Sequence, residues 1–160
     1  MLILGVDPGS RVTGYGAVSR EGRRLLRVES GTIRLRSEQD LSARLGQLQQ
    51  RFEAIIDGLA PAVVAVEDIF TSRNPRSALA LGQARGVVLA AAGRRALPVH
   101  AYPPATVKRA VSGHGRADKK QLQRMVQVLL SLERVPAQDE SDALAIAICH
   151  AMSAASHLRG

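Results

Sequence analysis

The sequence predicts an α/β domain built on a mixed, five-stranded β-sheet with helices on both faces. Three observations lead to this prediction. The first 35 residues hold three strand-like segments separated by turn residues, as in an antiparallel meander. A long helical segment then leads into another apolar strand, and such a crossover pairs its two strands in parallel. The rest of the chain alternates helices with one short strand, so we expect one domain over residues 1–160.

The first three strands follow from local patterns. Residues 2–6 form an apolar run that ends in Asp7-Pro8-Gly9, a sequence typical of a turn. Residues 12–18 and 25–35 are rich in apolar residues and contain glycines, as strands of a meander often do. We expect all three to lie in one sheet.

The crossover helix is predicted over residues 41–59. Its apolar residues recur with a 3.6-residue period, Asp40 stands at the N-cap position, and Gly58 and Pro61 mark its end. Residues 62–66 follow as a buried strand. The apolar stripe consists of Leu41, Leu45, Leu48, Phe52, Ile55, Ile56 and Leu59.

Four more helices and one strand complete the prediction. The helix over residues 76–93 is rich in Ala, Gly and Leu and is apolar on more than one face, so we expect it to contact both its own sheet and a second subunit. The single cysteine, Cys149, lies in an apolar helical pattern and is expected to fill the core. The remaining segments are a strand at 97–101 and helices at 104–111, 119–131 and 140–157.

Composition and charge narrow the functional classes. The formal net charge of +8 favours polyanionic partners, and nucleic acid fits better than a membrane because the basic residues are dispersed along the chain. No apolar stretch of about 18 residues and no secretory signal pattern occurs, so we expect a cytoplasmic protein. One cysteine excludes a disulfide framework and a Cys/His metal cluster.

Four carboxylates are predicted to meet at one end of the sheet. Asp7 and Glu67 follow strands that we expect to be parallel neighbours, and ligand sites of α/β sheets form at such carboxyl ends. Asp139 and Asp142 open the last helix, and Asp142 continues into its apolar stripe, so it should face the sheet. Carboxylates this close repel one another unless a cation such as Mg²⁺ or Mn²⁺ lies between them.

Each acid also has a simpler interpretation. Asp7 alone can be a turn former, and Asp139 can be an N-cap or a first-turn acid that favours the helix dipole. Asp68 competes with Glu67, because side chains alternate along a strand and only one of the two can point to the site. The residues alone leave these alternatives open.

Motifs along the chain resemble the RuvC family of Holliday-junction resolvases. The segment from Leu4 to Gly16 resembles the opening family block, and Val66-Glu67 followed by Phe70 resembles the second. The resemblance runs from about residue 2 to residue 152. Its later blocks are Ser77-Ala78-Leu79, Leu81 to Gly86, Val107-Lys108, Lys119, Asp139 and Asp142 to Ala147.

The resemblance implies a ribonuclease-H-like fold, a homodimer, and paired, metal-dependent incisions that resolve four-way DNA junctions. It implies RuvA and RuvB, the branch-migration proteins, as partners. It also implies two Mg²⁺ or Mn²⁺ ions per site, about 3.5–4 Å apart, that activate a water and stabilise the leaving oxygen. The implied catalytic acids and metal ligands are Asp7, Glu67, Asp139 and Asp142, the four that spacing also selects.

Basic and aromatic residues near these acids are the expected DNA contacts. The family places lysines beside the scissile phosphate, and Lys108 and Lys119 match them as both catalytic and DNA-binding residues. Phe70 matches an aromatic residue that stacks on bases, although a core position is the alternative. The further expected DNA contacts are Arg73, Arg76, His114, Arg116 and Lys120.

Three rival functions differ in what they require. Another ribonuclease-H-like nuclease also needs clustered acids, but the later motifs differ from ribonuclease H. An actin-like or sugar-kinase ATPase shares the Asp-x-Gly hairpin but needs two such domains. A junction-binding module without catalysis has no need for four inward-facing acids, so a cleavage assay with Mg²⁺ separates it from a nuclease.

Overall fold

The computed structural model describes residues 1–36, 39–68 and 74–157, and in these residues five strands form one sheet. The strand order is β3-β2-β1-β4-β5, and β1 pairs antiparallel with β2 but parallel with β4, so the sheet is mixed as predicted. The strands are β1 (Leu2–Asp7), β2 (Val12–Glu21), β3 (Arg24–Arg34), β4 (Val63–Glu67) and β5 (Val99–Tyr102).

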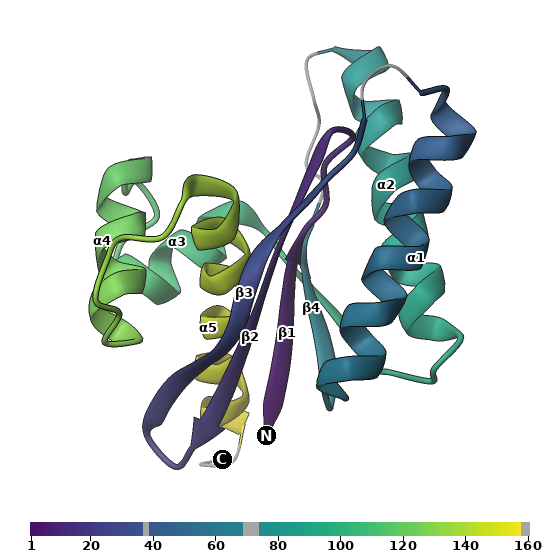
Figure 1. Ribbon diagram of the computed structural model, residues 1–160. Helices are drawn as coiled ribbons and strands as arrows, with labels where there is room; N and C mark the ends of the chain where they lie inside the picture. Colours follow the sequence, from purple (N-terminus) through teal and green to yellow (C-terminus); the bar gives the residue numbers. More distant parts are fainter. Residues whose placement is uncertain (37–38, 69–73, 158–160) are drawn as a thin grey trace.

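Helices cover both faces of the sheet, which confirms the predicted architecture. The pair α1 and α2 lies on one face, while α5 lies on the other with α3 and α4 outside it (Figure 1). None of the helices in the described residues is long and apolar enough to cross a membrane. The helices are α1 (Leu41–Leu59), α2 (Pro75–Gly93), α3 (Pro104–Ser112), α4 (Lys119–Leu129) and α5 (Gln138–His157).

Element boundaries follow the sequence patterns where capping signals are strong. The Asp40 carboxylate accepts a hydrogen bond from the Ala43 N–H at 2.8 Å, so α1 begins where its cap predicts. β5 begins later than predicted, because the Leu97 N–H instead closes the end of α2 on the Ala92 carbonyl. α5 begins earlier than predicted, so Asp139 lies inside its first turn and the N-cap interpretation of Asp139 is wrong.

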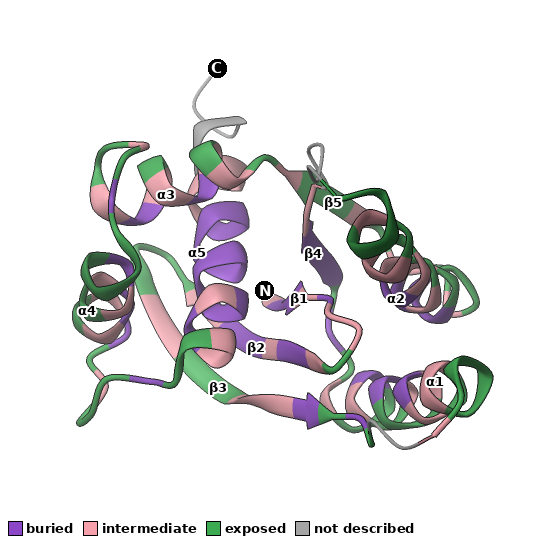
Figure 2. Ribbon diagram, turned by 90° about the horizontal axis from the view of Figure 1, so that it is seen from above, coloured by how far each residue is buried: buried purple, intermediate pink, exposed green. Residues whose placement is uncertain are grey.

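The sheet separates two hydrophobic layers. Residues of β1 alternate between them, since Ile3 packs on the α5 side and Leu4 on the α1 side with Phe52. α5 is the most enclosed helix, and its middle turns are buried (Figure 2). Cys149 is fully buried there, which confirms its predicted place in the core.

Three glycines let α5 lie directly on the backbone of β1 and β2. A Cβ atom at Gly5 would collide with the Ala143 carbonyl and stand 2.7 Å from the Ala147 nitrogen. Gly14 meets the Asp139 carbonyl in the same way, and Gly16 faces the side chain and nitrogen of Leu144. Because backbone faces backbone, the first turns of α5 lie against the carboxyl end of β1.

Replacing Gly5 with Ala is expected to destabilise the protein, because the new methyl group meets backbone that cannot move aside. We expect a loss of about 1–3 kcal/mol and a melting temperature lower by at least about 2 °C. The control is Gly46→Ala in α1, where the Cβ position is open and Ala should stabilise the helix by about 0.5–1 kcal/mol. Equal melting temperatures for Gly5→Ala and the wild type would contradict the proposed contact.

Candidate active site

A cavity of about 260 Å³ lies at the carboxyl ends of β1 and β4, beneath α3, α4 and the start of α5. It brings together three of the four predicted acids and both predicted lysines. Its lining residues are Asp7, Glu67, Pro104, Val107, Lys108, Lys119, Leu122 and Asp142.

Strand pairing accounts for the first two acids. Val6 pairs with Val66 in the parallel register of β1 and β4, so the next residues, Asp7 and Glu67, end neighbouring strands. Such strands lie about 4.8 Å apart, which places the two carboxylates side by side.

The structure shows which of the two neighbouring acids, Glu67 or Asp68, points into the cavity. Glu67 lines the cavity, whereas Asp68 lies outside it and stands 3.7 Å from Nη2 of Arg85 on α2. The same arginine donates a hydrogen bond from Nε to the Glu67 carbonyl at 3.4 Å. Arg85 thus helps hold the end of β4, a role that the sequence motif around it does not reveal.

The start of α5 supplies the third wall of the cavity. Asp142 lines the cavity, while Asp139 lies in the same helix but not among the lining residues. Burial raises the pKa of Asp142, and a hydrogen bond from the side chain of Gln138 to this carboxylate offsets a small part of that rise. The sequence does not reveal Gln138, because the predicted helix begins at residue 140 and the i, i+4 pair exists only in the longer helix of the structure.

Burial and mutual repulsion disturb the protonation of these acids. Desolvation, followed by the charges of Glu67, Asp142 and Asp139, raises the pKa of Asp7 to about 7. The pKa values of Glu67 and Asp142 are also raised, mainly by burial. Without a cation, the cluster therefore holds a proton near neutral pH.

The two lysines partly offset this repulsion. Lys119 lowers the pKa values of Asp7 and Asp142, and Lys108 lowers those of Glu67 and Asp142. Lys108 comes from α3 and Lys119 from the first position of α4, so two further helices contribute charge to the cavity.

The donor set fits a hard divalent cation. Carboxylate oxygens are the ligands that Mg²⁺ and Mn²⁺ prefer, and a cation would relieve the repulsion that raises the Asp7 pKa. In the described residues, no three His, Cys, Asp or Glu side chains are gathered as tightly as a formed metal site requires.

The other predicted DNA contacts lie outside the cavity lining. His114 and Arg116 are exposed in the connection between α3 and α4, and Lys120 is exposed on α4. Arg76 is exposed at the start of α2, on the other face of the sheet. Phe70 and Arg73 lie outside the described residues.

Comparisons with known proteins agree on one family. The sequence matches the family model described as crossover junction endodeoxyribonuclease RuvC over residues 3–150. The enzyme of that name from Citrifermentans bemidjiense is 52% identical over 154 residues, which cover 96% of this chain and 94% of the relative. The family-model match over residues 3–150 spans the positions of all four predicted acids.

Solved structures give the same result. Thermus thermophilus RuvC superposes with a TM-score of 0.89 and 34% identity, and the match covers 98% of this chain and 97% of that one. T. thermophilus RuvC in complex with Holliday junction substrate superposes with a TM-score of 0.93 and 33% identity, covering 98% and 96%.

Replacing Asp7 with Asn is expected to stabilise the metal-free protein above about pH 7. The folded state raises the Asp7 pKa from its usual 3.8 to about 7, so folding takes up a proton between these pH values. The contribution of Asp7 to stability is therefore fully present below about pH 4 and is lost as the pH rises to about 7, and Asn removes this loss. With EDTA present, the melting temperature of the variant should exceed the wild-type value at pH 8 by at least about 2 °C.

At pH 5 the melting temperatures of Asp7→Asn and the wild type should differ less, because Asp7 is then largely protonated in the folded wild type. A suitable control is Asp57→Asn, since the hydrogen bond from Arg95 lowers the pKa of that exposed carboxyl. This variant should not be stabilised at pH 8. An equal rise in melting temperature for Asp7→Asn at pH 5 and pH 8 would contradict the view that ionised Asp7 destabilises the metal-free protein.

Proposed function

The chain belongs to the RuvC family of crossover junction endodeoxyribonucleases, and we propose that its carboxylate cavity cuts four-way DNA junctions with the aid of divalent metal ions. The observation that carries the proposal is the convergence of Asp7, Glu67 and Asp142 on one cavity flanked by two lysines. The T. thermophilus relative in complex with Holliday junction substrate supports branched DNA as the substrate.

Acids in this position favour a nuclease over a module that only binds DNA. Three desolvated carboxylates repel the phosphate backbone, so they would weaken binding unless they served chemistry. Mg²⁺ or Mn²⁺, held by Asp7, Glu67, Asp142 and the nearby Asp139, would supply an activated water and stabilisation of the leaving oxygen.

The residues around the acids have separate roles. Lys108 and Lys119 can bind nonbridging phosphate oxygens and offset the added negative charge of the scissile group. Val107 and Leu122 form apolar parts of the wall, which limit water and strengthen electrostatic interactions inside the cavity. Hydrolysis of a phosphodiester bond in the carboxylate cavity would leave DNA ends that a ligase can rejoin.

We also propose a homodimer that makes paired, symmetric incisions. Leu79 on α2 is 64% exposed, and Gly82 and Gly86 on this helix have open space beside them, as a closely packed helix pair would require. A two-fold dimer would present two cavities to a two-fold junction. RuvA and RuvB stay proposed partners on the basis of the family resemblance.

Asp7→Asn and Glu67→Gln are each expected to abolish cutting of a synthetic four-way junction in Mg²⁺. Binding should persist or strengthen, because one repulsive charge beside the phosphate is removed. Asp68→Asn is the matched control, since this acid follows the same strand but lies outside the cavity, and it should keep most of its activity. Substantial cutting by Asp7→Asn would show that the proposed site is wrong.

Lys119→Arg is expected to slow cutting at saturating enzyme by roughly tenfold, or about 1.4 kcal/mol, with binding little changed. A guanidinium is wider than an ammonium and does not fit the same position beside a phosphate. Lys108→Arg should behave alike. Lys120→Arg is the control, because Lys120 is adjacent to Lys119 in sequence but does not line the cavity. If Lys108→Arg and Lys119→Arg cut at the wild-type rate, as Lys120→Arg should, the two lysines have no catalytic role.

A further inference from the structure

The second acid in the first turn of α5, Glu140, turns away from the active-site cavity and toward the edge strand β3. Its Oε1 accepts a hydrogen bond from the Ser30 hydroxyl at 2.6 Å. Arg27 Nη1 lies 3.9 Å from the same oxygen and donates a hydrogen bond to the Ser30 hydroxyl at 3.1 Å. These contacts connect β3 with a helix that follows 110 residues later.

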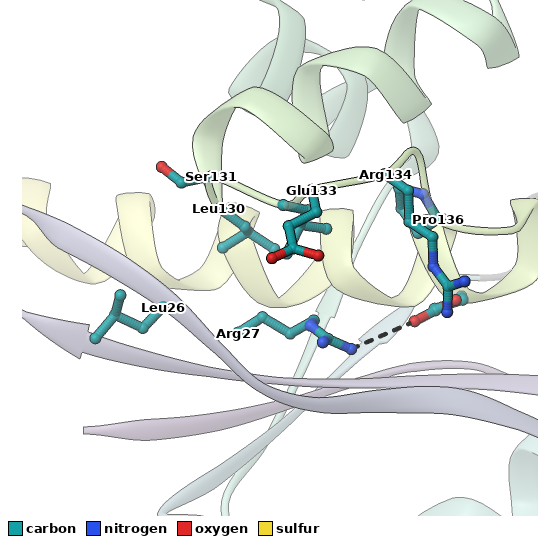
Figure 3. Close-up of a pocket in the computed structure, with 9 residues that line it drawn as sticks. Leu26, Arg27, Leu130, Ser131, Glu133, Arg134 and Pro136 are labelled. Carbon is teal, nitrogen blue, oxygen red and sulfur yellow. Dashed lines mark ion pairs between the residues drawn. The ribbon is translucent and has the colours of Figure 1, made fainter.

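The contacts stand at one end of a cavity of about 550 Å³ between β3 and the connection from α4 to α5 (Figure 3). Leu26 and Arg27 come from β3, and Leu130 and Pro136 belong to the opposite wall. Because this space separates the two elements, side-chain packing does not fill the region beside Glu140. The hydrogen bond from Ser30 is therefore a direct side-chain restraint on the first turn of α5 beside this cavity.

The other restraints on α5 act at different positions. Gly5 and Gly16 fix the helix from Ala143 onward, and Gly14 contacts it at the Asp139 backbone. These contacts set the distance between helix and sheet, and side-chain contacts such as that of Glu140 add a restraint on the rotation of the first turn. Successive helical residues are about 100° apart, so any rotation that moves Glu140 also moves Asp139 and Asp142.

We propose that Glu140 is a positioning residue whose hydrogen bond with Ser30 holds Asp139 and Asp142 toward Asp7 and Glu67. This inference rests on the proposed function of the carboxylate cavity. Glu140 itself does not line that cavity and acts through the helix turn that carries the two aspartates.

The hydrogen bond outweighs the ion pair in this link. A hydroxyl donor 2.6 Å from a carboxylate is a short, charge-assisted bond. The Arg27 and Glu140 side chains are 44% and 21% exposed and 3.9 Å apart, so solvent screens their attraction. A glutamine at position 140 keeps an acceptor oxygen for Ser30, whereas an alanine does not.

Mn²⁺ binding, followed by the electron paramagnetic resonance of free Mn²⁺, tests the proposal without requiring catalysis. Glu140→Ala and Ser30→Ala should each weaken Mn²⁺ affinity about two- to tenfold, as expected for the loss of one hydrogen bond. The Mg²⁺ concentration for half-maximal junction cutting should rise by a similar factor. Glu140→Gln and Ser30→Thr keep the bonding groups and should stay within about twofold of the wild type.

The cavity beside Glu140 also offers a control variant for the Mn²⁺ measurement. Glu133 lines the same cavity but forms no hydrogen bond or ion pair with the described residues, so Glu133→Ala should bind Mn²⁺ as the wild type does. The double variant with Ala at positions 30 and 140 should lose no more affinity than either single variant, since all three lack the same bond.

The outcomes separate the two proposals. Wild-type Mn²⁺ affinity in Glu140→Ala, or an equal loss in Glu140→Gln, would overturn the positioning role. Should Glu140→Ala fail to fold, Ser30→Ala with its Ser30→Thr rescue decides the question. A wild-type protein that neither binds Mn²⁺ nor cuts the junction would instead overturn the proposed function.

Discussion

The close contact between α5 and the backbone of β1 and β2 determines the geometry of the site. Parallel pairing of β1 with β4 can bring only Asp7 and Glu67 together. The acids of α5 join them because Gly5 and Gly14 carry no side chain that would hold the start of the helix away from the sheet. Without this contact, Asp139 and Asp142 would be ordinary first-turn acids on a surface helix.

That geometry has an energetic cost that the rest of the fold must offset. The raised pKa of Asp7 shows that carboxylates brought into one cavity oppose ionisation, and ionisation is what cation binding requires. Two hydrophobic layers, one on each face of the sheet, supply the stability that tolerates this repulsion. Lys108 and Lys119, which line the same cavity, reduce this cost further.

Much of this arrangement follows from the sequence. Hydrophobic periodicity, the Asp40 cap and the crossover rule predict α1 and the neighbouring ends of β1 and β4. The start of α5 is harder, because Gln138 and Asp139 precede the apolar repeat and resemble a cap or a loop. The link from Ser30 to Glu140 has no local signal, since it depends on how β3 crosses the sheet relative to α5.

The central claim is that the contact of α5 with β1 creates a cation site among acids from strand ends and a helix. A crystal grown with Mn²⁺ and measured for anomalous scattering tests it most directly. The account predicts anomalous density bounded by Asp7, Glu67 and Asp142, with Asp139 at its edge. Crystals without such density, grown at a Mn²⁺ concentration that supports junction cutting, would contradict it.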